Sequence, residues 1–387
     1  MKSQTPKEKI KIMKIIVNIS RVIVGILFIF SGLIKAMDPL GLAYKTQEFF
    51  EAWGDGGGAM GSVMNSLRDF ALGFSIVMIT IEVLAGVALL IGWRKNIVVW
   101  VLFYMTLFYT FLTAYSLFTG KIRECGCFGS CFPITDLQTF LKNLVLLALI
   151  IILLVGRKYI NPLFQAMSNF GVVVLTVMVV VYMQSYTLEH LPLIDCLPYK
   201  IGNNLLKLRE MPADATSDKF AYSFVYKKGG ETKEFTTDNL PDSTWQFVEQ
   251  KKVLVEKGNG KVPAINDFSL TDANGNDSTE TTLSQQGEYY LFFLNTLDKR
   301  SVYNWLNNFS NIVKKARAEK KNIYVITSDN IKVDSFINVK KKIDVPVYTC
   351  DMTAIKTAAR TTPTLFLMNG PVVENKWGVA DIGKASK

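Results

Sequence analysis

The stretch that decides the fold is I-V-V-W-V-L-F-Y-M-T-L-F-Y-T-F-L-T-A-Y-S-L-F, from Ile97 to Phe118. It runs for 22 residues without a charged side chain. About 20 apolar helical residues cross the roughly 30 Å hydrocarbon core of a bilayer. A bilayer also leaves few alternatives to a helix, because every backbone polar group must be bonded within the segment. The stretch therefore predicts a transmembrane helix and a membrane protein.

Four further apolar segments in the first half predict four more crossings. They are residues 15–34, 74–92, 140–155 and 163–183. The first follows a lysine-rich start, which is also typical of a cleaved signal peptide. Its length and its internal arginine favour a retained helix. From about residue 197 the sequence reads as a polar globular domain, so we expect five crossings followed by a soluble half.

Basic residues in the short loops predict the orientation of the helices. Arg94, Lys95, Arg157 and Lys158 would share the side of the lysine-rich N-terminus, whereas the loop over residues 38–69 is net acidic. We expect a bacterial inner-membrane protein with a cytoplasmic N-terminus and a C-terminal half in the oxidising periplasm. The net charge of +10 is spread over loops and helix ends, which indicates lipid headgroups and excludes a nucleic-acid partner. The expected partners are the lipid bilayer and a periplasmic client or redox protein.

The decapeptide E-C-G-C-F-G-S-C-F-P, residues 124–133, concentrates the cysteines. Three of the chain's five lie here, and Cys196 reaches the same side after the fifth segment. Disulfide exchange needs two sulfurs that meet and access for a third. A purely structural disulfide and a metal site are the alternatives; the metal site lacks the paired C-x2-C spacing and the chain has one histidine. The candidate exchange residues are Cys125, Cys127, Cys131 and Cys196, with no metal.

Arg21 and Glu82 are ionisable groups at membrane depth. Such groups are costly in hydrocarbon and usually face the interior of a bundle, often as pairs. One interpretation is a polar site at a proton path or at the ring of a membrane quinone, the candidate cofactor. The other is an Arg21–Glu82 ion pair that locks two helices. Lys35 is expected to extend to the membrane interface.

Three stretches of the first 160 residues resemble a known family. They are R-V-I-V-G-I-L-F-I-F-S-G-L-I-K-A-M-D-P (21–39), E-V-L-A-G-V-A-L-L-I-G (82–92) and C-G-C-F-G (125–129). They resemble the DoxX family, most closely its MauE branch of methylamine-utilisation membrane proteins. The resemblance implies a four-helix bundle related to vitamin K epoxide reductase and the DsbB-type oxidases. It also implies disulfide formation or electron transfer at Cys125 and Cys127, although the best-understood relatives use C-x-x-C.

The order strand, helix, strand, proline-led strand and hairpin over residues 263–377 resembles the thioredoxin fold. Thr362-Pro363 matches the cis-proline of that family, which implies binding of an extended peptide partner there. Asp298 and Ser301 stand where the family has its two cysteines, so this domain cannot exchange disulfides by the usual route. Cys350 is expected to be a free, partly buried thiol.

The predicted architecture is a membrane α-helical bundle, with a four-helix DoxX/MauE-like core and a fifth helix, followed by a soluble α/β thioredoxin-like domain. The expected boundaries are 1–160 for the four-helix domain, 161–204 for the fifth helix and a periplasmic tether, 205–262 for a small mixed α/β region and 263–387 for the thioredoxin-like domain. The small region should hold a strand pair around residues 229–230 and a helix over 243–250. The predicted function is that of an inner-membrane thiol-disulfide redox protein. The alternative is a non-enzymatic membrane scaffold whose outer domain binds a partner in an envelope complex.

Overall fold

The computed structural model describes residues 6–120, 122, 131, 134–216, 219–236, 239–256, 258, 261–297 and 302–386. Among these residues, five helices are long and apolar enough to cross a membrane: Pro6–Met37, Gly58–Ile91, Lys95–Thr119, Asp136–Tyr159 and Ala166–His190. The five predicted crossings are confirmed. The chain is a membrane protein with several spans, and its environment is a lipid bilayer.

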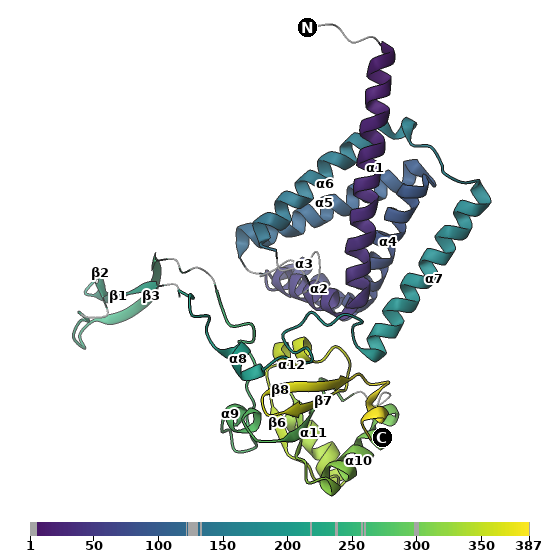
Figure 1. The fold of residues 1–387 in the computed structure, drawn as a ribbon. Helices are drawn as coiled ribbons and strands as arrows, with labels where there is room; N and C mark the ends of the chain where they lie inside the picture. Colours follow the sequence, from purple (N-terminus) through teal and green to yellow (C-terminus); the bar gives the residue numbers. More distant parts are fainter. Residues whose placement is uncertain are drawn as a thin grey trace.

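Four of these helices form a bundle, and a fifth lies against it (Figure 1). Helix α1 packs on α4 and α6, α5 packs on α6 and α4, and α7 lies along α4 and α1. The bounds are α1 Pro6–Met37, α4 Ala71–Ile91, α5 Lys95–Thr119, α6 Asp136–Gly156 and α7 Ala166–His190. Helices α1 and α4 approach closely, since a Cβ built on Gly86 would lie 2.9 Å from the Gly25 carbonyl oxygen. Small residues permit this kind of contact between membrane helices.

The segment between α1 and α4 is helical, although its charges had suggested a loop. It contains α2 Pro39–Gly54, α3 Gly58–Leu67 and the short helix η1 Arg68–Phe70. Asp38 caps α2 by accepting a hydrogen bond of 3.0 Å from the Gly41 amide, and proline occupies the first turn. Both features favour a helix start. The aromatic residues of α2 pack toward α5, where Trp53 meets Phe111 and Tyr115.

The C-terminal part contains a five-stranded sheet in the order β6-β5-β4-β7-β8. Strands β4, β5 and β6 are parallel, whereas β7 and β8 are antiparallel. Alternate residues of β4 face opposite layers: Leu291 and Phe293 join the cluster that contains α12, and Tyr290 and Phe292 join the cluster that contains α10. The bounds are α8 Leu205–Arg209, α9 Thr279–Leu283, β4 Glu288–Phe293, α10 Val302–Ala318, β5 Ile323–Thr327, α11 Asn330–Asp334, η4 Ser335–Lys340, β6 Val347–Thr349, α12 Met352–Ala358, β7 Thr364–Asn369, β8 Val372–Trp377 and η5 Ile382–Ser386.

This order of strands and helices agrees with the sequence prediction, and the Thr362-Pro363 bond is cis. The chain therefore combines a helical membrane part with an α/β domain. The identity of that domain as thioredoxin-like stays a prediction.

A second, three-stranded sheet in the order β2-β1-β3 extends away from the rest of the chain (Figure 1). Its strands are β1 Lys219–Lys228, β2 Glu231–Thr236 and β3 Gln246–Glu256. The hairpin around Gly229 and Gly230 is confirmed, and both glycines have positive φ. The helix expected over 243–250 is wrong, because residues 246–256 pair with β1 along its length. In a segment this short, the spacing of apolar and charged residues fits both the helical and the strand period. Pairing with β1 decides in favour of a strand.

The chain that follows α7 is built into the α/β domain. Tyr199 and Leu205 are buried in its core. Residues 202–205 also pair with the free edge of β8: Gly202 N–H donates to Val373 O at 2.8 Å, and Leu205 N–H donates to Pro371 O at 2.8 Å. We call residues 197–209 and 263–386 together the C-terminal domain.

Adding a methyl group at the α1–α4 contact should destabilise the bundle. We expect Gly86→Ala to lower the free energy of unfolding by about 1–3 kcal/mol, because the new Cβ meets the rigid backbone of α1. The control is Gly171→Ala in α7, where a Cβ has nothing within 4 Å. Unfolding by denaturant titration in detergent measures both, and equal stability of the two variants would contradict the close contact.

Candidate functional site

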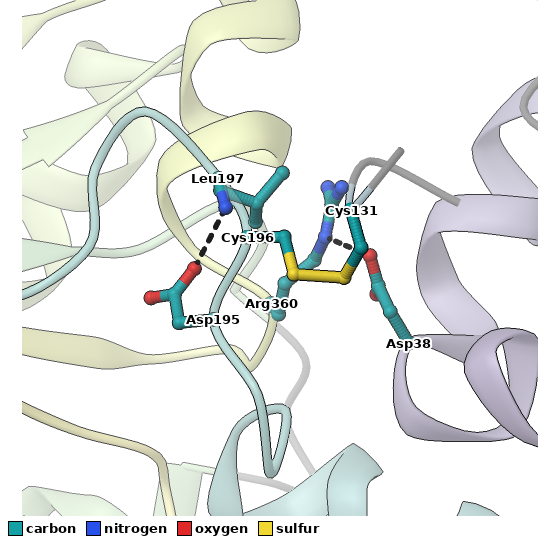
Figure 2. The surroundings of a disulfide bond; sticks show 6 residues. All are labelled: Asp38, Cys131, Asp195, Cys196, Leu197 and Arg360. Carbon is teal, nitrogen blue, oxygen red and sulfur yellow. Dashed lines mark hydrogen bonds and ion pairs between the residues drawn. A yellow bond between two sulfur atoms is a disulfide. The ribbon is translucent and has the colours of Figure 1, made fainter. Parts of the chain in front are cut away.

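A disulfide joins Cys131, which lies between α5 and α6, to Cys196, which follows α7 (Figure 2). The two residues are 65 positions apart in the sequence, and their Cα atoms are 4.8 Å apart. Of the four cysteines predicted for the site, the structure brings these two together. The other two, Cys125 and Cys127, lie outside the described residues.

Two ion pairs flank this disulfide. Arg360 Nε lies 3.0 Å from Asp38 Oδ2, and Lys376 Nζ lies 2.7 Å from Asp195 Oδ2. Arg360 and Lys376 come from the C-terminal domain, whereas Asp38 caps helix α2. Figure 2 shows Asp38, Arg360 and Asp195 around the two sulfur atoms. The cysteine pair therefore sits at the junction between the membrane helices and the C-terminal domain.

The predicted peptide-binding pair, Thr362 and Pro363, belongs to the segment that carries Arg360. Thr362 is half-buried and Pro363 is buried. Nearby, the Ala380 amide donates to the Glu189 carbonyl at 3.1 Å. This side of the domain therefore faces the end of α7 within the same chain. The positions matched to the missing dithiol, 298 and 301, lie outside the described residues.

Cys350 is free, as predicted, and it is fully buried, not partly buried. Its side chain belongs to the core of the C-terminal domain. Burial raises the pKa of this thiol to about 12. Because the thiolate is the reactive form, Cys350 is inert at neutral pH.

Glu82 pairs with Lys35, not with Arg21. Lys35 Nζ lies 2.8 Å from both carboxylate oxygens and 3.1 Å from Ser31 Oγ. The Tyr109 hydroxyl donates to Glu82 Oε2 at 3.0 Å. Lys35 and Glu82 are 5% and 2% exposed. The predicted Arg21–Glu82 pair and the expected interfacial position of Lys35 are therefore both wrong.

The register of α1 and α4 explains these corrections. The two helices are antiparallel, and Arg21 lies 14 residues before Lys35, about 21 Å along a helix. Arg21 therefore reaches the other end of α4, where Nε donates to Leu89 O at 2.9 Å and Nη2 donates to Leu90 O at 2.6 Å. The last carbonyls of a helix lack partners within it, and a cation there also suits the helix dipole. Arg21 thus caps α4.

Tyr109 borders two cavities. One, of about 30 Å³, borders Lys35, Glu82, Thr106 and Asn143, and is large enough for a water molecule. The other, of about 520 Å³, has an almost wholly apolar lining. Seven aromatic residues surround it: Phe49, Phe50, Trp53, Phe70, Phe74, Phe108 and Tyr109.

Sequence reasoning missed both Tyr109 and this cavity. Tyr109 lies within an apolar run, where no charge marks it. The aromatic residues of α2 stand in a segment that the acidic residues had identified as a loop. Their spacing, with Phe49, Phe50 and Trp53 on one helical side, was the available signal.

Removing one charge of the buried pair should destabilise the bundle more than removing both. We expect Lys35→Met or Glu82→Met to cost about 3–5 kcal/mol, because each leaves an unpaired buried charge. The double variant should be less destabilised than either single variant.

Lys45→Met is the matched control, since the Lys45–Glu48 pair is partly exposed and such pairs contribute about 0–1 kcal/mol. Denaturant titration of all four variants measures these differences. Additive effects of the two buried substitutions would contradict the pairing.

Comparison with known proteins separates the chain into parts. The family model of the methylamine utilisation protein MauE matches residues 13–156, and a model for a domain of unknown function, DUF8463, matches residues 220–257, which hold the three-stranded sheet. No curated protein matches the chain. The MauE match covers helices α1 to α6, with the Lys35–Glu82 pair, Tyr109 and the cysteine-rich segment. The helical N-terminal part of this membrane protein is therefore MauE-like over residues 13–156.

Proposed function

We propose that the protein is a membrane thiol-disulfide redox protein that supports disulfide formation or electron transfer. The observation that carries the proposal is the Cys131–Cys196 bond, which links the cysteine-rich segment to a cysteine held by the C-terminal domain. Both cysteines are half-buried and border a small cavity, so neither residue is sealed within a core. Cys125 and Cys127 lie six and four residues before Cys131 and complete the proposed exchange centre.

The proposed reaction conserves atoms and electrons. A thiolate of a client protein attacks a disulfide of this centre and forms a mixed disulfide. The second client thiolate breaks that bond, so the client leaves as a disulfide and the centre keeps two thiols. Two electrons and two protons must then leave those thiols for an acceptor.

A membrane quinone fits the acceptor role, because it takes up two electrons and two protons. The apolar cavity of about 520 Å³ supports its binding, since aromatic side chains stack on planar rings. We assign Tyr109 as the polar contact of the quinone in this cavity. Its hydroxyl is oriented by the hydrogen bond that it donates to Glu82. Arg21, which sequence reasoning placed beside Glu82, does not reach this cavity. Leu112 of the cavity wall lies eight residues before Gly120, which follows the end of α5, and this is about 12 Å along a helix.

The proposed location is the bacterial inner membrane, with the N-terminus in the cytoplasm. The N-terminal end of α1 and the C-terminal domain lie at opposite ends of the bundle (Figure 1). Lys95 begins α5 and Arg157 follows α6, so both lie at the same end as the N-terminus. The excess of basic residues at cytoplasmic ends supports an oxidising compartment for the cysteine pair.

A scaffold without turnover is the second candidate function. The same disulfide would then serve as a permanent link between the membrane helices and the C-terminal domain. Partner binding would involve the segment with Thr362 and Pro363, or the projecting three-stranded sheet. The fate of the sulfurs during client oxidation separates the two functions.

Alanine variants of the four cysteines proposed for the exchange centre test turnover. The full chain in lipid nanodiscs, with a short-chain ubiquinone, would be mixed with a fluorescent dithiol peptide. We expect Cys125→Ala, Cys127→Ala, Cys131→Ala and Cys196→Ala each to lower the rate of peptide oxidation at least about tenfold, because exchange needs paired sulfurs.

Cys350→Ala is the matched control and should keep the wild-type rate, since Cys350 is buried in the core. Wild-type rates in the Cys125 and Cys127 variants, with a Cys131–Cys196 bond that persists in mild reductant, would reject the exchange function and favour the scaffold.

Filling the aromatic cavity tests the acceptor. Gly73 lines the cavity, and a Cβ there has nothing within 4 Å. We expect Gly73→Leu to weaken binding of a short-chain ubiquinone by about tenfold, because its side chain occupies the space for the ring. Gly171→Leu, an equal change in α7 away from the cavity, should bind like the wild type. Quenching of tryptophan fluorescence measures the dissociation constant, and equal values for both variants would refute this site.

A further inference from the structure

The disulfide connects two separately built parts of the chain. Cys196 is followed by Leu197, which is 5% exposed, and by Tyr199, which is 2% exposed and lies in the core of the C-terminal domain. Cys131 lies between two membrane helices. The C-terminal domain, which has no cysteine pair among its described residues, thus holds Cys196 of the junction disulfide through the residues that directly follow it.

Lys376 of β8 fixes the backbone around Cys196. Its side chain is 4% exposed, and its Nζ lies 2.7 Å from Asp195 Oδ2 and 4.8 Å from the centre of the Phe366 ring. The other oxygen of Asp195 accepts a hydrogen bond of 3.0 Å from the Leu197 amide. One carboxylate therefore binds Lys376 and closes the turn in which Cys196 is the middle residue. Burial lowers the pKa of Lys376, and Asp195 opposes that shift.

Arg360 anchors the same domain to the membrane helices beside Cys131. Its Nε lies 3.0 Å from Asp38 Oδ2, with the two side chains 9% and 20% exposed. Asp38 also borders a small cavity together with Cys131 and Cys196. The guanidinium lies 5.6 Å from the centre of the Tyr44 ring in α2. Arg360 thus holds the domain at the position where the two sulfurs meet.

We propose that Lys376 and Arg360 are positioning residues for the Cys131–Cys196 pair, through which the C-terminal domain presents Cys196 to the membrane helices. The equilibrium between a dithiol and its disulfide depends on how often the two sulfurs meet. Contacts that hold Cys196 beside Cys131 therefore favour the bond. Linkage makes the effect reciprocal, so the bond favours docking of the domain by the same factor.

This inference deepens the proposed function and rests on it for its biological purpose. The two can fail separately, because the equilibrium of the bond is measured without a client protein and without an acceptor. A domain that presents a cysteine in this way has a role in exchange even though it lacks a dithiol of its own.

The experiment uses the full chain in nanodiscs, with Cys125→Ala and Cys127→Ala to isolate the pair. Samples are equilibrated with reduced and oxidised glutathione; two glutathione thiols reduce the bond and yield two protein thiols and one glutathione disulfide. Acid quenching, alkylation and mass spectrometry then give the oxidised fraction.

We expect Lys376→Met and Arg360→Met each to lower the equilibrium constant for bond formation by about five- to tenfold, close to 20–30 mV for a two-electron couple. Arg360→Lys, which keeps the charge, should recover most of that loss. Lys332→Met is the control, because the Lys332–Asp329 pair is an exposed ion pair of the same domain. Values within twofold of the wild type in both Met variants would overturn the proposal.

A second measurement, hydrogen exchange, tests the reciprocal effect in the chain that keeps Lys376 and Arg360. Reduction of the bond should speed exchange of the Ala380 amide, which bonds across the junction to Glu189. The Leu291 amide in the central strand β4 should stay protected. If a Met variant loses protection at Leu291, that variant has unfolded and its equilibrium constant is not used. The coupling is then tested by comparing Ala380 protection in the oxidised and the reduced chain that keeps Lys376 and Arg360. Unchanged protection of Ala380 on reduction would then reject the coupling.

Discussion

The ion pair between Lys35 and Glu82 sets the arrangement on which the junction depends. An isolated charge inside a membrane bundle is costly, so each group needs the other at contact distance. Because the two residues lie on antiparallel helices, their contact fixes how far α1 extends along α4. Helix α1 ends at Met37, and Asp38 follows at once. The register that pairs the charges therefore also places the carboxylate that receives Arg360.

The parts of the fold that follow from local pattern were predictable from sequence. The five apolar segments and the strands of the C-terminal domain each carry their own period and end signals. The partner of Glu82 was not predictable in this way, since two cations on one helix are equal candidates until the register of the neighbouring helix is known. The prediction of a helix over 243–250 was wrong for a related reason, because pairing with β1 decides the conformation of that segment.

The candidate site also contains residues that the sequence reveals and residues that only the folded structure reveals. The cysteine-rich segment is visible in the sequence, and the basic residues predict the side of the membrane on which it lies. The choice of Cys196 as the partner of Cys131 depends on contacts between segments far apart in the chain. Lys376 and Arg360 gave no signal in the sequence, since a lysine in a strand and an arginine after a short helix are ordinary surface residues until the domain docks.

The burial of Cys350 has a consequence for biosynthesis. An odd thiol in an oxidising compartment competes for the wrong partner while a chain matures, and a protein with several disulfides can be trapped by such mispairing. Once the core around Cys350 has formed, its sulfur is withdrawn from that competition. Four cysteines then remain, an even number, and burial of Cys350 protects the maturing chain from mispairing with its own fifth thiol.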